Sequence, residues 1–146
     1  MTQTARTKVF FTSDAHLGSG YHQDPLAVEQ RLVRWLQHIE PEARAVYFLG
    51  DMFDYWFEYR AVVPRGYVRF LGQVALMSDR GVEIHFFAGN HDVWFRDYVQ
   101  QELGAQVHHH ALECVLDGKR FRLAHGDEES QSEGWTSAFL YRLFRN

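Results

Sequence analysis

The sequence predicts an α/β protein with a parallel sheet, and three observations support this prediction. Short apolar runs alternate with longer segments whose apolar residues recur at helical spacing, which is the repeating unit of a parallel sheet with crossover helices. Each apolar run stops abruptly at polar residues or glycine. The 146 residues, 46% of them hydrophobic, are enough for one domain with its own core.

The first two elements are expected between residues 8 and 41. An apolar run over 8–13 predicts a buried strand, and the polar residues and glycines after it predict a loop. Asp24 is expected to cap the next helix, with Pro25 at its first position and Pro41 closing it. Its apolar positions recur at i, i+3, i+4 and i+7; they are Leu32, Trp35, Leu36 and Ile39.

Two further strands and a second helix follow. Continuous apolar runs over 45–49 and 82–88 predict buried strands, each ended by a glycine and a polar residue. The helical pattern returns from about 66 to 80, with Gly81 as its C-terminal cap. All three strands therefore stop at polar loops, and ligands of such sheets bind beyond the carboxyl ends of the strands.

The remainder of the chain predicts a short helix and a hairpin. Residues 95–102 are amphipathic, and the runs 111–115 and 120–124 flank an Asp-Gly pair that is typical of a tight hairpin turn. No repeat, linker or change of composition divides the sequence. We therefore expect residues 1–146 to form a single domain.

Composition excludes several classes of protein. Fifteen Lys and Arg against nineteen Asp and Glu give a formal net charge of −4, which offers no basic surface for a nucleic-acid partner. Cys114 is the only cysteine, so an intrachain disulfide and a thiolate zinc site are excluded. The N-terminus is unlike a signal peptide, and no uncharged run approaches the ~20 residues of a membrane span. We expect a cytoplasmic protein that is at most peripheral on the inner membrane.

Metal-ligand side chains follow each predicted strand. In an extended segment residues i and i+2 face the same way, so Asp14 and His16 are expected to address one ion together. Carboxylate, amide and imidazole donors form a mixed set that suits Mn²⁺, Fe or Zn²⁺ better than Ca²⁺. The four segments are Asp14-Ala15-His16, Gly50-Asp51-Met52-Phe53-Asp54, Gly89-Asn90-His91-Asp92 and His125-Gly126-Asp127.

These four segments, in this order, resemble the calcineurin-like metallophosphoesterases, and the resemblance spans Val9 to Asn146. It implies a β-sandwich flanked by helices (αββα) that carries a binuclear metal centre. The amino-acid sequences of the segments 13–18, 50–59 and 85–92 are similar to those of the UDP-2,3-diacylglucosamine diphosphatase family of lipid A biosynthesis. That family implies a binuclear-metal hydrolase that cleaves the pyrophosphate of a UDP-sugar lipid.

The resemblance also implies a role for each ligand candidate. Asp14 and His16 would hold the first metal ion, Asp51 would bridge both ions, and Asn90 and His125 would hold the second. The two divalent ions are expected to be Mn²⁺, with Fe, Zn²⁺ and Mg²⁺ as alternatives.

Two further roles concern catalysis and substrate. His91 matches the histidine that assists phosphoryl transfer without binding metal, and Asp92 is expected to pair with it and fix its tautomer. Trp56 and Phe57 are candidates for an acyl or uridine pocket, although core packing explains buried aromatics equally well.

The sequence also departs from the family pattern. The family supplies further metal ligands from a Gly-His-x-His segment that these 146 residues lack, so we expect the N-terminal portion of the fold. The alternatives are another calcineurin-like phosphatase or phosphodiesterase, or a non-catalytic metal-binding fragment. The apolar residues of 139–144 would contact a membrane surface or pack on further chain. His108-His109-His110 is interpreted as an exposed loop.

Overall fold

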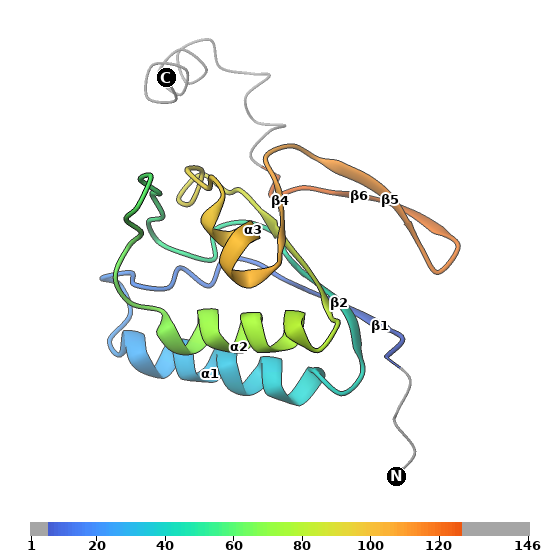
Figure 1. Ribbon diagram of the computed structural model, residues 1–146, viewed down its shortest axis with the longest axis horizontal. Coiled ribbons are helices and arrows are strands. Elements are labelled where there is room, and N and C mark those ends of the chain that lie inside the picture. Colours follow the sequence, from blue (N-terminus) through green and yellow to red (C-terminus); the bar gives the residue numbers. More distant parts are fainter. Residues whose placement is uncertain (1–5, 127–146) are drawn as a thin grey trace.

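The computed structural model describes residues 6–126 and contains three helices and six strands in that range. The order of the elements matches the predicted alternation of strands and helices except for one additional strand, β4, at residues 106–108 (Figure 1). The elements are β1 (Lys8–Thr12), α1 (Pro25–Ile39), β2 (Ala43–Phe48), α2 (Val68–Asp79), β3 (Glu83–Phe87), α3 (Tyr98–Leu103), β4 (Gln106–His108), β5 (Leu112–Leu116) and β6 (Lys119–Leu123).

The first four strands form one parallel sheet in the order β1-β2-β3-β4. The strands follow their order in the sequence, and right-handed crossovers between such neighbours place every connecting helix on the same face of the sheet. Accordingly α1 and α2 lie side by side on one side, while β5 and β6 form a hairpin that extends away from them (Figure 1). The expected parallel α/β architecture is confirmed.

Alternation along β2 and β3 assigns the two faces of the sheet. Val46 and Phe48 of β2 join Ile84 and Phe86 of β3 in the core that the helices cover. The intervening residues point to the other face, where Tyr47 and Phe87 pack with Leu123 of the hairpin. The helix-covered face is the main core of the molecule, and the hairpin covers part of the opposite one.

Helix ends are held by side chains, one of them from a distant element. Asp24 accepts a hydrogen bond from the amide of Ala27 at 2.9 Å, which confirms the predicted cap of α1. The first turn of α2 has no such local cap, but Glu29 of α1 accepts from the amides of Arg69 and Phe70 at 3.0 and 3.1 Å. This carboxylate therefore fixes α1 against the start of α2.

Two expectations about strands are corrected. β1 is an edge strand of the described sheet, so Phe11 is 39% exposed and the predicted full burial is wrong. Residues 106–108 form the strand β4, so the exposed loop that we expect at His108 is wrong. His108 Nε2 lies 3.0 Å from Nδ1 of the buried His85, and only His109 and His110 of the histidine run are exposed.

None of the helices in residues 6–126 combines the length and the apolar character that a bilayer span requires. The apolar segment 139–144, for which we considered a membrane contact, lies outside the described residues.

Candidate metal centre

The loops after β1 and β2 are joined by backbone hydrogen bonds, which brings the first two ligand segments together. The amides of Asp14, His16 and Leu17 donate to the carbonyls of residues 50, 51 and 52 at 3.1, 3.0 and 2.9 Å. In the other direction, the amide of Asp54 donates to the carbonyl oxygen of Leu17 at 3.0 Å. The parallel pairing of the two strands therefore continues into the loops, and their side chains meet beyond the sheet.

Three ligand candidates adopt a left-handed backbone conformation. The φ angles are 55° at Asp14, 42° at His16 and 52° at Asp51. A strained non-glycine residue costs on the order of 1–3 kcal/mol and persists where surrounding contacts over-determine it. Asp14 and His16 do converge as predicted, but the reason given from an extended segment is wrong, because the chain turns at both residues.

Close backbone packing at the site requires two glycines. Gly50 has a φ of 91°, and a Cβ there would overlap the ring of His125. At Gly89 a Cβ would overlap the carboxylate and the backbone of Asp51. Any larger residue at either position would push a ligand candidate out of place.

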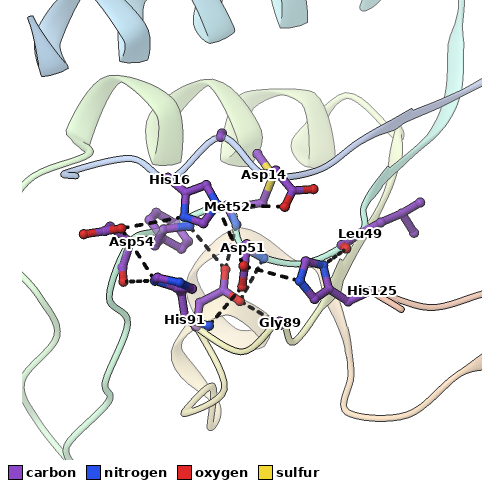
Figure 2. Close-up of polar contacts among 12 residues, drawn as sticks. Asp14, His16, Leu49, Asp51, Met52, Asp54, Gly89, His91 and His125 are labelled. Carbon is purple, nitrogen blue, oxygen red and sulfur yellow. Dashed lines mark hydrogen bonds and ion pairs between the residues drawn. The ribbon is translucent and has the colours of Figure 1, made fainter. Parts of the chain in front are cut away.

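Asp14, His16 and Asp51 form one compact group of metal-ligand atoms. The Nε2 atom of His16 lies 3.8 Å from Oδ1 of Asp14 and 3.8 Å from Oδ2 of Asp51 (Figure 2). Such spacing leaves room for one cation between the three side chains. The structure thus brings together all three residues that were expected to surround the first ion.

His125 reaches Asp51 from the opposite side. Its Nδ1 lies 2.8 Å from the carbonyl oxygen of Leu49, an acceptor, so Nδ1 carries the proton in the neutral ring. Its Nε2 is then a lone-pair donor, and it lies 3.3 Å from Oδ2 of Asp51 (Figure 2). One carboxylate oxygen therefore faces both His16 and His125, as a bridging ligand does.

Asn90 is exposed in the loop after β3, between Gly89 and His91. The neighbouring amide of His91 donates to Oδ1 of Asp51 at 2.9 Å, which ties this loop to the bridging carboxylate. The loop is therefore close to the group formed by Asp14, His16 and Asp51. Its expected role as a ligand stays a prediction.

The partner of His91 is Asp54, which corrects the pairing expected from the sequence. Nδ1 of His91 lies 3.0 Å from the backbone oxygen of Asp54 and 3.5 Å from its Oδ1 (Figure 2). Both are acceptors, so Nδ1 is protonated and Nε2 points away from them. The His91 ring also meets that of His16 edge-on, with centroids 4.8 Å apart.

Asp92 instead binds the backbone of two loops. Its Oδ1 accepts from the amides of Asp51 and Gly89 at 3.1 and 2.8 Å, and its Oδ2 from those of Met52 and Phe53 at 2.8 and 3.2 Å. Complete burial raises the pKa of Asp92 above its usual 3.8, while these amide donors act in the opposite direction. All its oxygens are engaged, so the expected role in fixing the tautomer of His91 is wrong.

Trp56 is part of the core, which contradicts its assignment to a substrate pocket. The side chain has no exposed surface, and its Nε1 donates to Glu58 at 2.9 Å. Glu58 is itself buried and also accepts from the amides of Arg96 and Tyr98 at 2.8 and 3.1 Å. An indole this large is buried by packing, and its polar nitrogen still finds an acceptor.

Phe57 remains a candidate for substrate binding, because it lines an open cleft of about 490 Å³ beside the metal-ligand loops. Its ring lies 5.5 Å from that of Trp94 and 4.8 Å from that of Tyr59. The sequence interpretation missed Trp94, although it follows Asp92 by only two positions and so lies on a ligand loop. Arg96 and Glu58 also line the cleft.

Comparisons with known proteins agree with this geometry. The model of the calcineurin-like phosphoesterase family matches residues 7–146. A UDP-2,3-diacylglucosamine hydrolase from Porphyromonas gingivalis is 65% identical over 141 residues, which are 97% of this chain and 54% of that protein. A protein of the same name from Nitrosococcus oceani is 33% identical over 118 residues, 81% of this chain and 45% of the relative.

The chain therefore spans about half the length of the relatives it matches. A crystal structure of an Aquifex aeolicus protein of unknown function has a TM-score of 0.51 at 19% identity, covering 80% of this chain and 59% of that one. That likeness supports the fold alone. With the family match over nearly its whole length and the ligand segments gathered beyond one sheet edge, the chain belongs to the calcineurin-like phosphoesterase family.

Proposed function

We propose that the protein hydrolyses the pyrophosphate bond of a UDP-2,3-diacylglucosamine-like lipid and that it uses two divalent metal ions. The substrate is inferred from the names of its relatives, which are UDP-2,3-diacylglucosamine hydrolases. Mn²⁺ is the ion we propose, because the donors combine carboxylates with imidazoles. We also propose that the protein acts in the cytoplasm at the surface of the inner membrane, where an acylated substrate would be found.

The observation that carries the proposal is the position of Asp51. One of its carboxylate oxygens faces His16 Nε2 at 3.8 Å and His125 Nε2 at 3.3 Å. Asp14 completes the group on the side of His16. A carboxylate that lies between two imidazoles fits a pair of cations. Bound divalent ions supply Lewis-acid stabilisation of the phosphoryl oxygens and a water of lowered pKa.

His91 is the residue we assign to proton transfer. The Asp54 backbone oxygen holds the proton on Nδ1, and the side chain of His91 is 41% exposed. Its Nε2 is therefore free to meet the substrate and, in the protonated ring, to donate a proton to the leaving oxygen. Asp54 Oδ1 lies 3.5 Å from Nδ1 and stabilises the positive charge of that ring.

The cleft beside the ligand loops is our proposed site for the apolar part of the substrate. Phe57, Tyr59 and Trp94 offer aromatic surface there, and Arg96 offers a charge for a phosphate. We propose that acyl chains contact these rings.

The bridging role is tested with Asp51→Asn and a matched control, Asp79→Asn, which lies exposed at the end of α2. A neutral amide no longer balances two cations, so we expect Asp51→Asn to lose bound Mn²⁺ and activity together. We expect added Mn²⁺ to raise the melting temperature of the unsubstituted chain and of Asp79→Asn, but not of Asp51→Asn. Unchanged metal content in Asp51→Asn contradicts the bridging role.

The reaction class is tested with a panel of substrates in Mn²⁺. We expect cleavage of acylated UDP-sugars to exceed that of UDP-glucose, phosphomonoesters and phosphodiesters. Equal rates with and without acyl chains argue against the aromatic cleft. Tight metal binding without turnover of any substrate would assign the chain to the non-catalytic alternative.

A further inference from the structure

His22 packs its ring against the loop that carries the first two ligand candidates. Its Nε2 lies 3.1 Å from the carbonyl oxygen of His16 and 3.3 Å from that of Ala15. Both partners accept hydrogen bonds, so Nε2 carries a proton in the neutral and in the charged ring. The ring therefore donates one hydrogen bond that is shared between two carbonyl oxygens.

Two successive turns bring the ring to this position. The amide of Ser19 donates to the carbonyl of His16 at 3.0 Å, and the amide of His22 donates to the carbonyl of Ser19 at 3.2 Å. Ser19 is buried, and its Oγ accepts from the amide of Tyr21 at 3.3 Å. The segment 16–22 thus folds back on itself, and the side chain of its last residue meets the backbone of its first.

The two carbonyls that His22 contacts define the conformation of His16. The Ala15 carbonyl belongs to the peptide plane before the Cα of His16, and the His16 carbonyl to the plane after it. The orientation of these two rigid planes sets φ and ψ at that residue. His16 has a φ of 42°, a conformation that is uncommon for a non-glycine residue and persists where surrounding contacts hold it.

The direction of the His16 side chain follows from that backbone. Its Nε2 faces Asp14 and Asp51 at 3.8 Å from each (Figure 2). If the peptide planes relax toward a common conformation, the Cα–Cβ bond of His16 turns and Nε2 leaves this position. The left-handed turn is therefore a condition for the ligand geometry.

We propose that His22 is a positioning residue for the metal centre, whose shared Nε2–H hydrogen bond to Ala15 and His16 holds His16 in the conformation that points its Nε2 at the two carboxylates. The proposal rests on the proposed function in so far as it takes His16 to be a metal ligand. Groups that orient ligands in this way are worth about 10–100-fold in metal affinity.

The first test measures Mn²⁺ affinity in three variants of the full chain. His22→Phe keeps an aromatic ring without the donor, and His22→Gln places an amide N–H near the position of Nε2. His38→Phe is the matched control, since His38 is exposed on α1. We expect His22→Phe to bind Mn²⁺ about 10–100-fold more weakly, with His22→Gln restoring most of the affinity and His38→Phe unchanged. Equal affinity in His22→Phe and the unsubstituted chain overturns the proposal.

The second test needs no metal. Amide hydrogen exchange at His16, Leu17 and Ser19 reports the loop directly, because all three amides donate within it or to the neighbouring loop. We expect faster exchange at these amides in metal-free His22→Phe and near-normal exchange in His22→Gln. Unchanged exchange in His22→Phe overturns the proposal even if metal binds. If exchange is faster in His22→Phe but the unsubstituted chain binds no Mn²⁺, His22 does fix the loop conformation, and it is the proposed function that is contradicted.

Discussion

The helix-covered core and the ligand edge, by which we mean the loops after β1 and β2 that carry Asp14, His16 and Asp51, are neighbours in the fold. They are nevertheless built in opposite ways. The core packs apolar side chains such as Phe48 and Phe86 from regular strands. A few residues further on, Asp51 and His16 combine charge with a left-handed backbone. The core gains free energy from burial, whereas the ligand edge costs free energy in strain and repulsion until a cation binds. Stability and function therefore depend on different residues of one sheet.

The largest effect that separates the two regions is expected at His91. His91→Ala is expected to lower turnover by about 10²–10⁴-fold, because the proton donor is lost. Metal content and the free energy of unfolding should stay close to those of the unsubstituted chain, since His91 is partly exposed. Steady-state kinetics, metal analysis and denaturant unfolding check this. Loss of metal in this variant would show that His91 is a ligand.

The opposite behaviour is expected in the core. Phe48 has no exposed surface, so Phe48→Ala is expected to lower the free energy of unfolding by about 3–5 kcal/mol. Phe11→Ala is the matched variant on the edge strand, where the ring is 39% exposed, and should cost about 1 kcal/mol. Denaturant unfolding at constant metal concentration measures both. Similar losses in the two variants would contradict the assigned core.

Asp92 sharpens the comparison because it belongs to both regions. In Asp92→Asn an NH₂ group replaces one oxygen and faces two amide donors, so we expect a loss of about 2–4 kcal/mol in the free energy of unfolding. Metal affinity should fall as well, since the carboxylate holds the loops of Asp51 and Gly89 together. Asp54→Asn, at a partly exposed carboxylate of the same site, should cost less than about 1 kcal/mol. Equal stability of the two variants would contradict the role of Asp92.

The smallest effect is expected from a pair of histidines on the face opposite the helices. Burial lowers the pKa of His85, and of His108 beside it, below the usual 6.5. The unfolded chain then binds protons more readily than the folded one, so stability is lost as pH falls below about 6.5 toward the folded pKa values. Chelator-treated protein, unfolded at several pH values, shows the slope. His85→Gln should flatten it, and an unchanged slope would exclude these rings as its source.

The sequence predicted the order of strands and helices well, because the spacing of apolar residues and the glycines and prolines that end each element are local signals. The helix with its Asp24 cap and the Asp-Gly turn of the hairpin are confirmed, since each depends on residues a few positions apart. The three-residue strand β4 was missed because so short a run has no measurable period. The edge position of β1 depends on strand order, which local patterns do not contain.

The sequence predicted which residues gather at the candidate site more accurately than it predicted their hydrogen-bond partners. Because these residues follow the ends of predicted strands, the sequence correctly predicted that Asp14, His16, Asp51 and His125 lie near one another. The partners of His91 and Asp92 were wrong, because an Asn-His-Asp run gives no sign that its carboxylate turns inward to bind amides from a loop some 40 positions earlier. Trp56 was misassigned for the same reason, since its acceptor Glu58 is visible only in three dimensions.

The left-handed turns also restrict how this site can change during evolution. Asp, Asn and His are the residues other than glycine that tolerate that backbone conformation best, and they are also metal ligands. Glutamate or cysteine would bind a cation equally well in chemical terms, but at positions 14, 16 and 51 the backbone disfavours them. Among the side chains that bind divalent cations, Asp, Asn and His are therefore favoured over glutamate and cysteine at these positions by the backbone alone. Backbone conformation, as much as affinity for metal, defines which substitutions a descendant can inherit.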